Sequence, residues 1–385
     1  MLASELSAYL VPSDVVGSYP FADKKYCIGN QIVRLHDHPD VPIRPTDIII
    51  IGIQSTNSVS NAIRQKLWGL SSISYSKGRI FDAGNIPASL TLAQQYQAVE
   101  TLSAQVAESK AHLVFIGGSQ ELTSKVYAGW RQSQNFLRLA IIDYKIDWDG
   151  NHDDFHEDNF VNGLMDEPYE KLLDLSFIGI QGYFSPQHTQ QKVLRRKHEF
   201  IRLGNLRGNI REAEPTLSDA HLVSIDFGAL RTPDAPGTKI ANPNGLYAEE
   251  ICMLARYAGI GQNNKFMGFF GLSSNGNTPE LTTMLTAQVI WHYIEGVSHR
   301  KVENPIKNLP FNKKYVVSTD VPNIEMVFYR NEQSGNWWFE LPVLNRRKIL
   351  RGKILVRCNP SDYASASNGD IPQRWMRWYQ KAQKI

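Results

Sequence analysis

Short, almost wholly apolar segments recur along the first 272 residues of the chain, and stretches with helical periodicity separate them. The apolar segments cover residues 47–54, 112–117, 137–143, 175–181, 221–227 and 266–272, and the helical stretches cover 58–70, 90–109, 119–134, 245–258 and 279–295. Strands that are apolar on both faces belong to a parallel sheet that helices cover on both sides. The repeated strand–helix units therefore predict an α/β fold, either a doubly wound open sheet or a (β/α) barrel, and periodicity alone does not distinguish the two.

The character of the sequence changes near residue 300. Residues 300–385 carry 16 basic and 7 acidic side chains, whereas residues 1–299 carry 25 basic and 31 acidic ones. We therefore predict two parts, an α/β domain at 1–299 and a small, basic, Trp-rich and β-rich appendage at 300–385. Within the appendage, the pattern predicts a hairpin, a third strand and a terminal helix, at residues 323–330, 337–341, 352–357 and 372–383.

The basic and aromatic residues of the appendage allow three interpretations. Basic side chains interleaved with exposed aromatic rings can bind single-stranded nucleic acid. The Trp side chains can instead form the core of a small domain whose charges are solvated. Alternatively, the basic surface docks on the acidic 1–299 part, within one chain or between chains. The last two interpretations are favoured, so nucleic acid is not expected as a partner.

Composition excludes several classes of protein. The three cysteines, Cys27, Cys252 and Cys358, have no paired spacing, which excludes a disulfide scaffold and a Cys-based zinc site and indicates a reducing compartment. No apolar run reaches the roughly 18 residues that a membrane helix needs. The first residues lack the basic and apolar regions of a signal peptide. We therefore expect a cytoplasmic protein that makes no contact with membranes.

Polar and acidic side chains follow three of the predicted strands. Gln120 comes after the 112–117 segment, Asp143 and Asp147 come at and after the end of the 137–143 segment, and Asp226 ends another strand. Ligands of open α/β sheets bind at the carboxyl ends of the strands. Carboxylates that cluster there usually bind a metal or another cation. The strand ends are therefore the expected place for a small-molecule ligand.

The order and spacing of these segments resemble the ureohydrolase superfamily, which contains arginase, agmatinase and, most similar here, formiminoglutamase. That family carries Gly-Gly-X-His, then Asp-Ala-His-X-Asp, then Asp-X-Asp near an Ala-Pro-Gly turn. The corresponding segments here begin at Gly117, Asp143 and Asp226, and the turn begins at Ala235. The resemblance covers roughly residues 45–298. It implies a three-layer α/β/α fold with a central, mostly parallel sheet, as in arginase, and a homo-oligomer.

The resemblance also implies a two-manganese site that activates a bridging hydroxide to attack a guanidino or formimino carbon. Three of the six implied metal-ligand positions keep the family residue, and three do not. The retained residues are Asp143, Asp147 and Asp226, and the substituted positions are Gln120 and Lys145, where the family has His, and Gly228, where it has Asp.

These substitutions remove the second metal of the implied pair. Glycine at 228 offers no side-chain oxygen, and the ammonium of Lys145 has no lone pair with which to bind a metal. We expect Lys145 to be a structural cation that forms charge-assisted hydrogen bonds with Asp143 and Asp226. The remaining oxygen donors, Gln120 with the three aspartates, could hold one hard cation such as magnesium or calcium, and less readily manganese.

Two functions follow from this degenerate ligand set. The first is a ureohydrolase-fold protein without hydrolase activity and without a cofactor, which acts in binding or scaffolding as a homo-oligomer or with a protein partner. The second is an active formimidoylglutamase-like hydrolase of a non-peptide C–N bond that uses one divalent ion, magnesium, calcium or manganese. The two differ in the metal content of the purified protein.

An acidic segment at residues 147–158 follows the second strand end. Its composition resembles a calcium loop, but the flanking helices and the terminal Glu of that motif are absent. The segment is either a solvated loop or a functional lip over the strand ends. In the second case, His152 or His156 is the candidate to replace a missing metal ligand.

Overall fold

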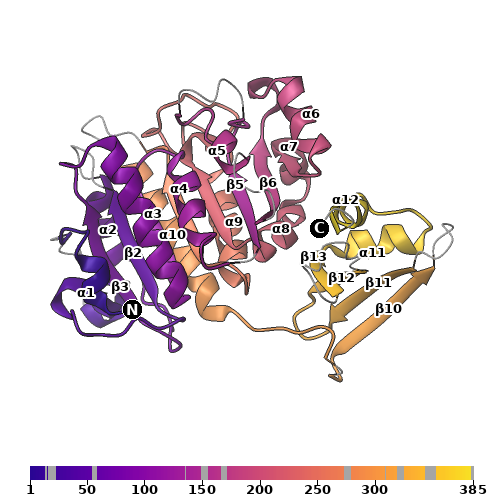
Figure 1. The fold of residues 1–385 in the computed structure, drawn as a ribbon, viewed down its shortest axis with the longest axis horizontal. Coiled ribbons are helices and arrows are strands. Elements are labelled where there is room, and N and C mark those ends of the chain that lie inside the picture. Colours follow the sequence, from indigo (N-terminus) through magenta and orange to yellow (C-terminus); the bar gives the residue numbers. More distant parts are fainter. Residues whose placement is uncertain are drawn as a thin grey trace.

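Two separate sheets form the framework of the chain (Figure 1). The computed structural model describes all residues except 14, 16–22, 54–58, 135, 149–154, 166–170, 273–278, 308, 319–324, 343–352 and 383–385. The first sheet has nine strands in the order β1-β3-β2-β4-β9-β8-β5-β6-β7, and every neighbouring pair is parallel. In chain order its strands are β1 Ile32–Arg34, β2 Ile48–Ile53, β3 Ile80–Ile86, β4 His112–Ile116, β5 Leu137–Ile142, β6 Leu172–Ile180, β7 Glu199–Arg202, β8 Leu222–Asp226 and β9 Phe266–Phe270.

This sheet is open, because β1 and β7 form its two edges and do not pair with each other. The prediction of an α/β fold with a central parallel sheet is therefore confirmed, and the alternative of a closed barrel is excluded. The helices are α1 Ala3–Ser7, α2 Val59–Trp68, α3 Leu92–Ser109, α4 Leu122–Trp130, α5 Val161–Met165, α6 Gln187–Arg195, α7 Leu203–Gly208, α8 Glu214–Asp219, α9 Ala248–Ile260, α10 Glu280–His299, α11 Pro360–Ser367 and α12 Gln373–Ala382.

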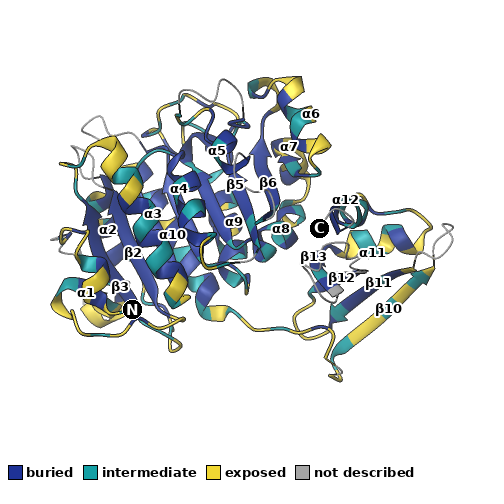
Figure 2. Ribbon diagram, viewed as in Figure 1, coloured by how far each residue is buried: buried dark blue, intermediate teal, exposed yellow. Residues whose placement is uncertain are grey.

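Helices cover both faces of the nine-stranded sheet, and strand β2 shows how. All six residues of β2 are buried. Ile48 and Ile50 belong to a core that they share with α2, α9 and α10, whereas Ile49 and Ile51 belong to a second core that they share with α3 and α4. Successive side chains of a strand point to opposite faces, so a two-sided apolar strand needs two helix layers. Figure 2 shows the central strands buried throughout.

The second sheet is antiparallel and forms the framework of the C-terminal part. Its strands, in spatial order, are β10 Asn312–Ser318, β11 Glu325–Asn331, β12 Trp337–Pro342 and β13 Lys353–Cys358. The predicted hairpin, third strand and terminal helix are all present, while β10 and α11 were not predicted. Trp337, Trp375 and Trp378 form the core of this part together with Phe328 and Phe339. The Trp side chains therefore lie in a small core, but the charges of this part are not all solvated, since Arg357 and Lys381 are buried.

Strand β3 was not predicted from the sequence either, because its segment contains polar residues, which are buried in the structure. The guanidinium of Arg64, on α2, is fully buried and satisfies them: its Nε lies 2.9 Å from Oδ1 of Asp82, and its Nη2 donates to the carbonyl oxygen of Gly84 at 2.7 Å. A buried charge is tolerated when it is paired and hydrogen-bonded in this way. A polar segment therefore occupies the interior beside β2.

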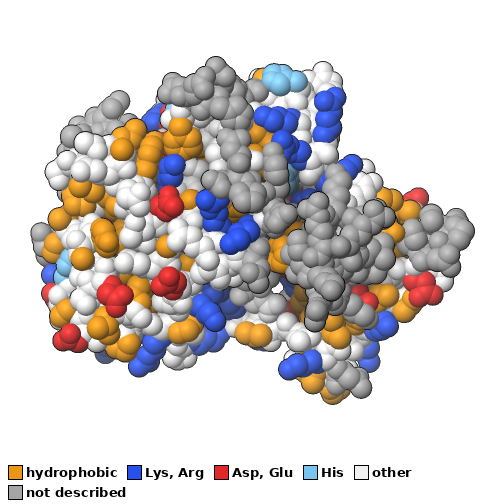
Figure 3. All heavy atoms as spheres, in the orientation of Figure 1, with side chains coloured by type: hydrophobic (Ala, Val, Ile, Leu, Met, Phe, Trp, Pro, Cys, Tyr) orange, Lys and Arg blue, Asp and Glu red, His pale blue; other side chains and the backbone are white. Residues whose placement is uncertain are grey.

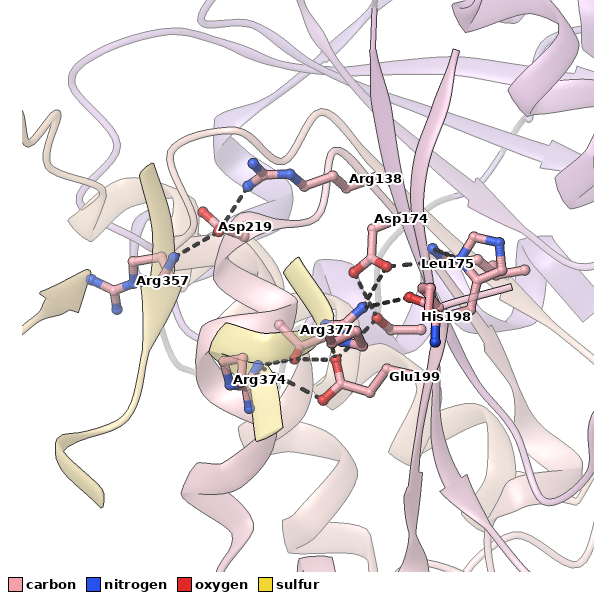
Figure 4. Close-up of polar contacts among 12 residues, drawn as sticks. Arg138, Asp174, Leu175, His198, Glu199, Asp219, Arg357, Arg374 and Arg377 are labelled. Carbon is pink, nitrogen blue, oxygen red and sulfur yellow. Dashed lines mark hydrogen bonds and ion pairs between the residues drawn. The ribbon is translucent and has the colours of Figure 1, made fainter. Parts of the chain in front are cut away.

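The C-terminal sheet and its helices dock on the first domain through charged side chains (Figure 4). Arg377, on α12, reaches Asp174 of β6 and Glu199 of β7, both at 2.7 Å. The backbone N–H of Arg357, on β13, donates to Oδ2 of Asp219 at 2.9 Å. The third interpretation of the appendage, docking of its basic groups on the acidic part, therefore also holds within one chain.

Across the described ranges, no helix is long and apolar enough to cross a membrane.

Candidate functional site

The predicted site residues lie at the carboxyl ends of neighbouring strands. Strands β4, β9, β8 and β5 are adjacent in the middle of the sheet. Gln120 follows β4, Asp143 and Asp147 follow β5, and Asp226 is the last residue of β8. The parallel arrangement brings the ends of these strands to one edge of the sheet. The side chains that the sequence separates by more than 100 positions are therefore brought together.

The three aspartates form an acidic cluster, in which Asp143 and Asp147 are buried and Asp226 is half-buried. The side chain of Asp143 is 1% exposed and that of Asp147 is 4% exposed. Burial, together with the nearby carboxylates of Asp147 and Asp226, raises the pKa of Asp143 well above its usual value. Burial also raises the pKa of Asp147 to about 7 and that of Asp226 to about 6. The proximity of Asp143 and Asp147 favours a proton on one of them. The cluster therefore holds protons near neutral pH.

Lys145 is paired with different acids from those that the sequence predicted. Its ammonium lies 2.9 Å from Oδ1 of Asp147 and also contacts Asp158, rather than Asp143 and Asp226. Asp226 instead accepts a hydrogen bond from the backbone N–H of Gly228 at 2.5 Å. The acidic loop brings Asp158 to the other side of the ammonium. Burial alone would lower the pKa of Lys145, but Asp147 and Asp158 together raise it, so the cation is retained.

Asp143 is held by the backbone of the turn that follows it. Its Oδ1 accepts from the N–H of Tyr144 at 2.6 Å and from the N–H of Lys145 at 3.4 Å. The backbone of Lys145, and not its ammonium, is therefore the part of that residue that contacts Asp143. The carboxyl group is fixed in the turn, so the Lys145 side chain is free to extend past it to Asp147.

Gly228 occupies a place with no room for a side chain. A Cβ atom there would lie 2.8 Å from Oδ1 of Asp226 and 3.1 Å from a ring carbon of Tyr144. The Tyr144 ring is itself held edge-on against Phe184, with ring centroids 5.1 Å apart. Gly271, at the end of β9, has φ of 74°, and a Cβ there would lie 2.2 Å from the same Asp226 oxygen. Both positions are therefore closed to a further carboxylate.

Gln120 is the one substituted residue that offers an oxygen. Its amide nitrogen donates to the hydroxyl of Ser224 at 3.2 Å, and that hydroxyl lies 2.7 Å from the hydroxyl of Thr123. The amide oxygen of Gln120 is buried and has no hydrogen-bond partner in the structure. An unpartnered buried oxygen is costly. It is therefore the atom of this site most in need of a donor or a cation.

The donor set does not fit a pair of dications. Among the residues that the structure describes, no three His, Cys, Asp or Glu side chains are grouped so as to hold a metal ion. The ammonium of Lys145 carries positive charge into the cluster, and Gly228 supplies no oxygen. Backbone N–H groups contact Asp143 and Asp226, and Lys145 pairs with Asp147, whose Oδ1 has no hydrogen-bond partner besides this ion pair.

The acidic loop contributes two residues that the sequence did not single out. Glu157 accepts a hydrogen bond from the hydroxyl of Ser119 at 2.5 Å and forms an ion pair with Lys239 at 2.6 Å. Together with the Lys145–Asp158 pair, these contacts tie the loops after β4, β5 and β8 to one another. In the sequence, only the acidic composition of residues 147–158 indicated that this loop contributes side chains to the site. His156 is half-exposed and turned toward Asp158, at 3.7 Å, and His152 lies outside the described residues.

The family model of the arginase family matches residues 43–295, and the chain belongs to this family. This confirms the ureohydrolase resemblance that the strand-end motifs indicated. A search of the curated proteins finds no sequence relative.

Solved structures of the same superfamily share the fold. Formimidoylglutamase from Bacillus subtilis is 16% identical with a TM-score of 0.64, and the match covers 78% of this chain and 99% of that one. Formiminoglutamase from Trypanosoma cruzi, crystallised with Mn²⁺, is 20% identical with a TM-score of 0.59, covering 66% and 95%. Proclavaminate amidino hydrolase from Streptomyces clavuligerus is 18% identical with a TM-score of 0.55, covering 67% and 94%.

Proposed function

We propose that this chain is a non-catalytic member of the arginase family that acts by binding or scaffolding. The observation that carries the proposal is the ion pair between Lys145 and Asp147, 2.9 Å long, inside the acidic cluster. Hydrolysis by this superfamily is expected to use two metal ions that together generate hydroxide at neutral pH. An ammonium already pairs with one of the carboxylates that the metal pair would need.

The crowding at Gly228 supports the same proposal. A ligand oxygen at that position would require Tyr144 and Asp226 to move, because a Cβ already approaches Asp226 to 2.8 Å. The packing around Tyr144 therefore leaves no room for a ligand of the second metal ion at residue 228, and the sequence supplies none there. We infer that the strand-end site serves as a charge-neutralised structural centre.

The Gln120 oxygen favours a second candidate function, an active hydrolase with one hard cation. Gln120, Asp143, Asp147 and Asp226 would hold the ion, since all are oxygen donors and the Gln120 oxygen lacks a partner. The ion would act as a Lewis acid on a formimino or guanidino group. The oxygen donors would hold this ion with Lys145 beside it. Asp147 would exchange protons with the substrate, since burial raises its pKa to about 7.

Metal analysis of protein purified without chelator separates the two candidates. We expect magnesium, calcium and manganese each far below one ion per chain, and no turnover of formiminoglutamate, arginine or agmatine with added manganese. About one ion per chain that is lost in Asp143→Asn would favour the one-metal hydrolase. Two manganese ions per chain, or manganese-dependent turnover of any of the three compounds, would overturn the non-catalytic proposal.

A further inference from the structure

A histidine of the first domain lies in the contact between the two parts of the chain. His198 comes between α6 and the edge strand β7 and is 7% exposed. Lys381, on α12 of the C-terminal part, is buried as well, and its ammonium lies 3.3 Å from Nδ1 of His198. The surface is indented where the two parts meet (Figure 3). This pair of side chains therefore joins the first domain to the C-terminal part.

The hydrogen bonds of His198 determine its protonation state. The backbone N–H of Leu175, on β6, donates to Nδ1 of His198 at 3.2 Å. The Lys381 ammonium faces the same nitrogen, and an ammonium has no lone pair with which to accept. Nδ1 must therefore offer its own lone pair to both donors. The docked arrangement thus requires a neutral imidazole at His198.

Asp174 balances the cations of this contact, as Figure 4 shows. Its Oδ1 accepts hydrogen bonds from Arg377 at 2.7 Å and from Lys381, both on α12. The same oxygen lies 3.8 Å from Nδ1 of His198, so a protonated imidazole would compete with the two α12 cations. Protonation of His198 would place three cations around one carboxylate in a buried site, where like charges repel strongly.

His198 is the group of this contact whose charge changes between pH 7 and pH 5. Burial lowers the pKa of Lys381 to about 8, so its ammonium stays charged in this range. Burial alone would raise the pKa of Asp174, but Arg377 and Lys381 hold it well below its usual value, so this acid stays ionised. The charged groups around His198 are Asp174 of β6, Glu199 of β7, Arg377 and Lys381 of α12 and, across the Trp148 ring, Lys192 and Arg196.

We propose that His198 is an acid-sensitive switch that releases the C-terminal part from the first domain. While His198 is neutral, it accepts from Lys381 and the two parts stay docked. When His198 binds a proton, Asp174 pairs with the imidazolium in place of the two α12 cations, and α12 separates. Release exposes Leu173, which packs against the core of the C-terminal part. The switch does not depend on the function of the strand-end cluster.

The size of the effect follows from the two protonation equilibria of His198. In the released state the imidazole has an ordinary pKa near 6.5. In the docked state burial lowers this pKa to about 4. The docked state therefore binds the proton less readily, and docking weakens as the pH falls below about 6.5, by up to about tenfold for each pH unit. From pH 7 to pH 5 we expect docking to weaken at least about tenfold.

Hydrogen exchange of the full-length chain tests the proposal. The backbone N–H of Arg357, on β13, donates to Asp219 of the first domain and so reports docking directly. Its exchange rate, divided by the intrinsic rate at each pH, gives the fraction of open molecules. We expect this fraction to rise at least about tenfold from pH 7 to pH 5. The amides of β2 should stay protected, because the first domain remains folded.

Two histidine variants separate the switch from the other groups of the interface. His198→Asn keeps an oxygen acceptor near the position of Nδ1 but does not titrate, so its open fraction should change little between pH 7 and pH 5. The matched control His38→Asn replaces an exposed histidine of the first domain and should respond to acid as the parent does. The proposal is overturned if the parent shows no rise, or if His198→Asn responds like the parent, which would assign the response to the carboxylates.

NMR of the His198 imidazole in the parent gives a second readout that needs no substitution at this residue. At pH 7 the ¹⁵N shifts should show an unprotonated Nδ1 and a protonated Nε2. On acidification, the protonation of His198 should have the same midpoint as the rise in exchange at Arg357. A His198 that is charged at pH 7, or that becomes charged while Arg357 stays protected, would overturn the proposal.

Discussion

The ammonium of Lys145 lies 2.9 Å from Oδ1 of Asp147, and the two side chains sit beside the buried Asp143 and the half-buried Asp226. Like charges held together in a buried site repel, and either a proton or a cation must offset them. In this chain both contribute, since Lys145 pairs with Asp147 and the raised pKa values of Asp143 and Asp147 favour the protonated acids. Charge balance at the strand ends is therefore reached with the chain's own groups.

Replacing Lys145 with Met should destabilise the protein most strongly at alkaline pH. The change leaves Asp147 buried without its cation, and breaking a buried pair costs about 3–5 kcal/mol, reduced here to about 2–4 kcal/mol because Lys145 keeps some exposure. The loss should be smaller at pH 5, where Asp147 is protonated. Urea unfolding at pH 5 and pH 8 measures both. Lys239→Met, which breaks an exposed pair, should cost under about 1 kcal/mol. Equal stability of Lys145→Met and parent at both pH values would refute this role of Lys145.

Replacing Asp226 with Asn should make the protein relatively more stable as the pH rises. The pKa of Asp226 is raised to about 6 in the folded state from 3.8, so the native state holds this proton longer than the unfolded state. The contribution of the protonated acid is complete below about pH 4 and is lost as the pH rises through about 6. Asn cannot titrate, so the stability of the variant minus that of the parent should increase between pH 4 and pH 8, by about 2 kcal/mol. Because the buried histidines titrate in both proteins, their contribution cancels when the stability of the parent is subtracted from that of the variant. A difference that does not vary with pH would contradict the assignment.

Adding a side chain at residue 228 should cost stability without creating a metal site. Gly228→Ala places a Cβ 2.8 Å from the Asp226 carboxylate, and overpacking of this kind costs about 1–3 kcal/mol. Gly204→Ala is the matched control, because no atom lies within 4 Å of its Cβ position and Ala is favoured in helix α7. That control should be neutral or slightly stabilising. The double variant Lys145→His/Gly228→Asp should therefore unfold more readily than the parent. Tight manganese binding by a stable double variant would show that the cluster can open.

Replacing Arg377 with Ala should loosen the C-terminal part. Arg377 bridges Asp174 and Glu199, and its loss leaves a buried carboxylate with one cation fewer, at a cost of about 2–4 kcal/mol. Trypsin should then cleave the segment between α10 and β10 faster. Lys314→Ala, on the exposed edge strand β10, should leave the digestion rate unchanged. If Arg377→Ala is digested like the parent, docking does not depend on this residue.

The central strands could be predicted because their apolar runs leave no alternative to a sheet covered on both faces. Strand β3 could not, since the polar residues Asp82 and Asn85 are acceptable inside only because Arg64 reaches them from another element. At the site, the sequence indicated which aspartates gather at the strand ends. It did not indicate which of them Lys145 reaches, because Asp158 is positioned by a loop.

The contacts between the two parts of the chain also determine when the fold can be completed. Asp174 lies 203 residues before Arg377, and Glu214 lies 143 residues before Arg357. During synthesis the N-terminal domain folds first, at a time when these basic partners have not yet been made. The newly formed domain must then keep several carboxylates hydrated at its surface. Translation of the last few dozen residues supplies their partners, so a ribosome that stops early releases a domain with an unneutralised acidic face.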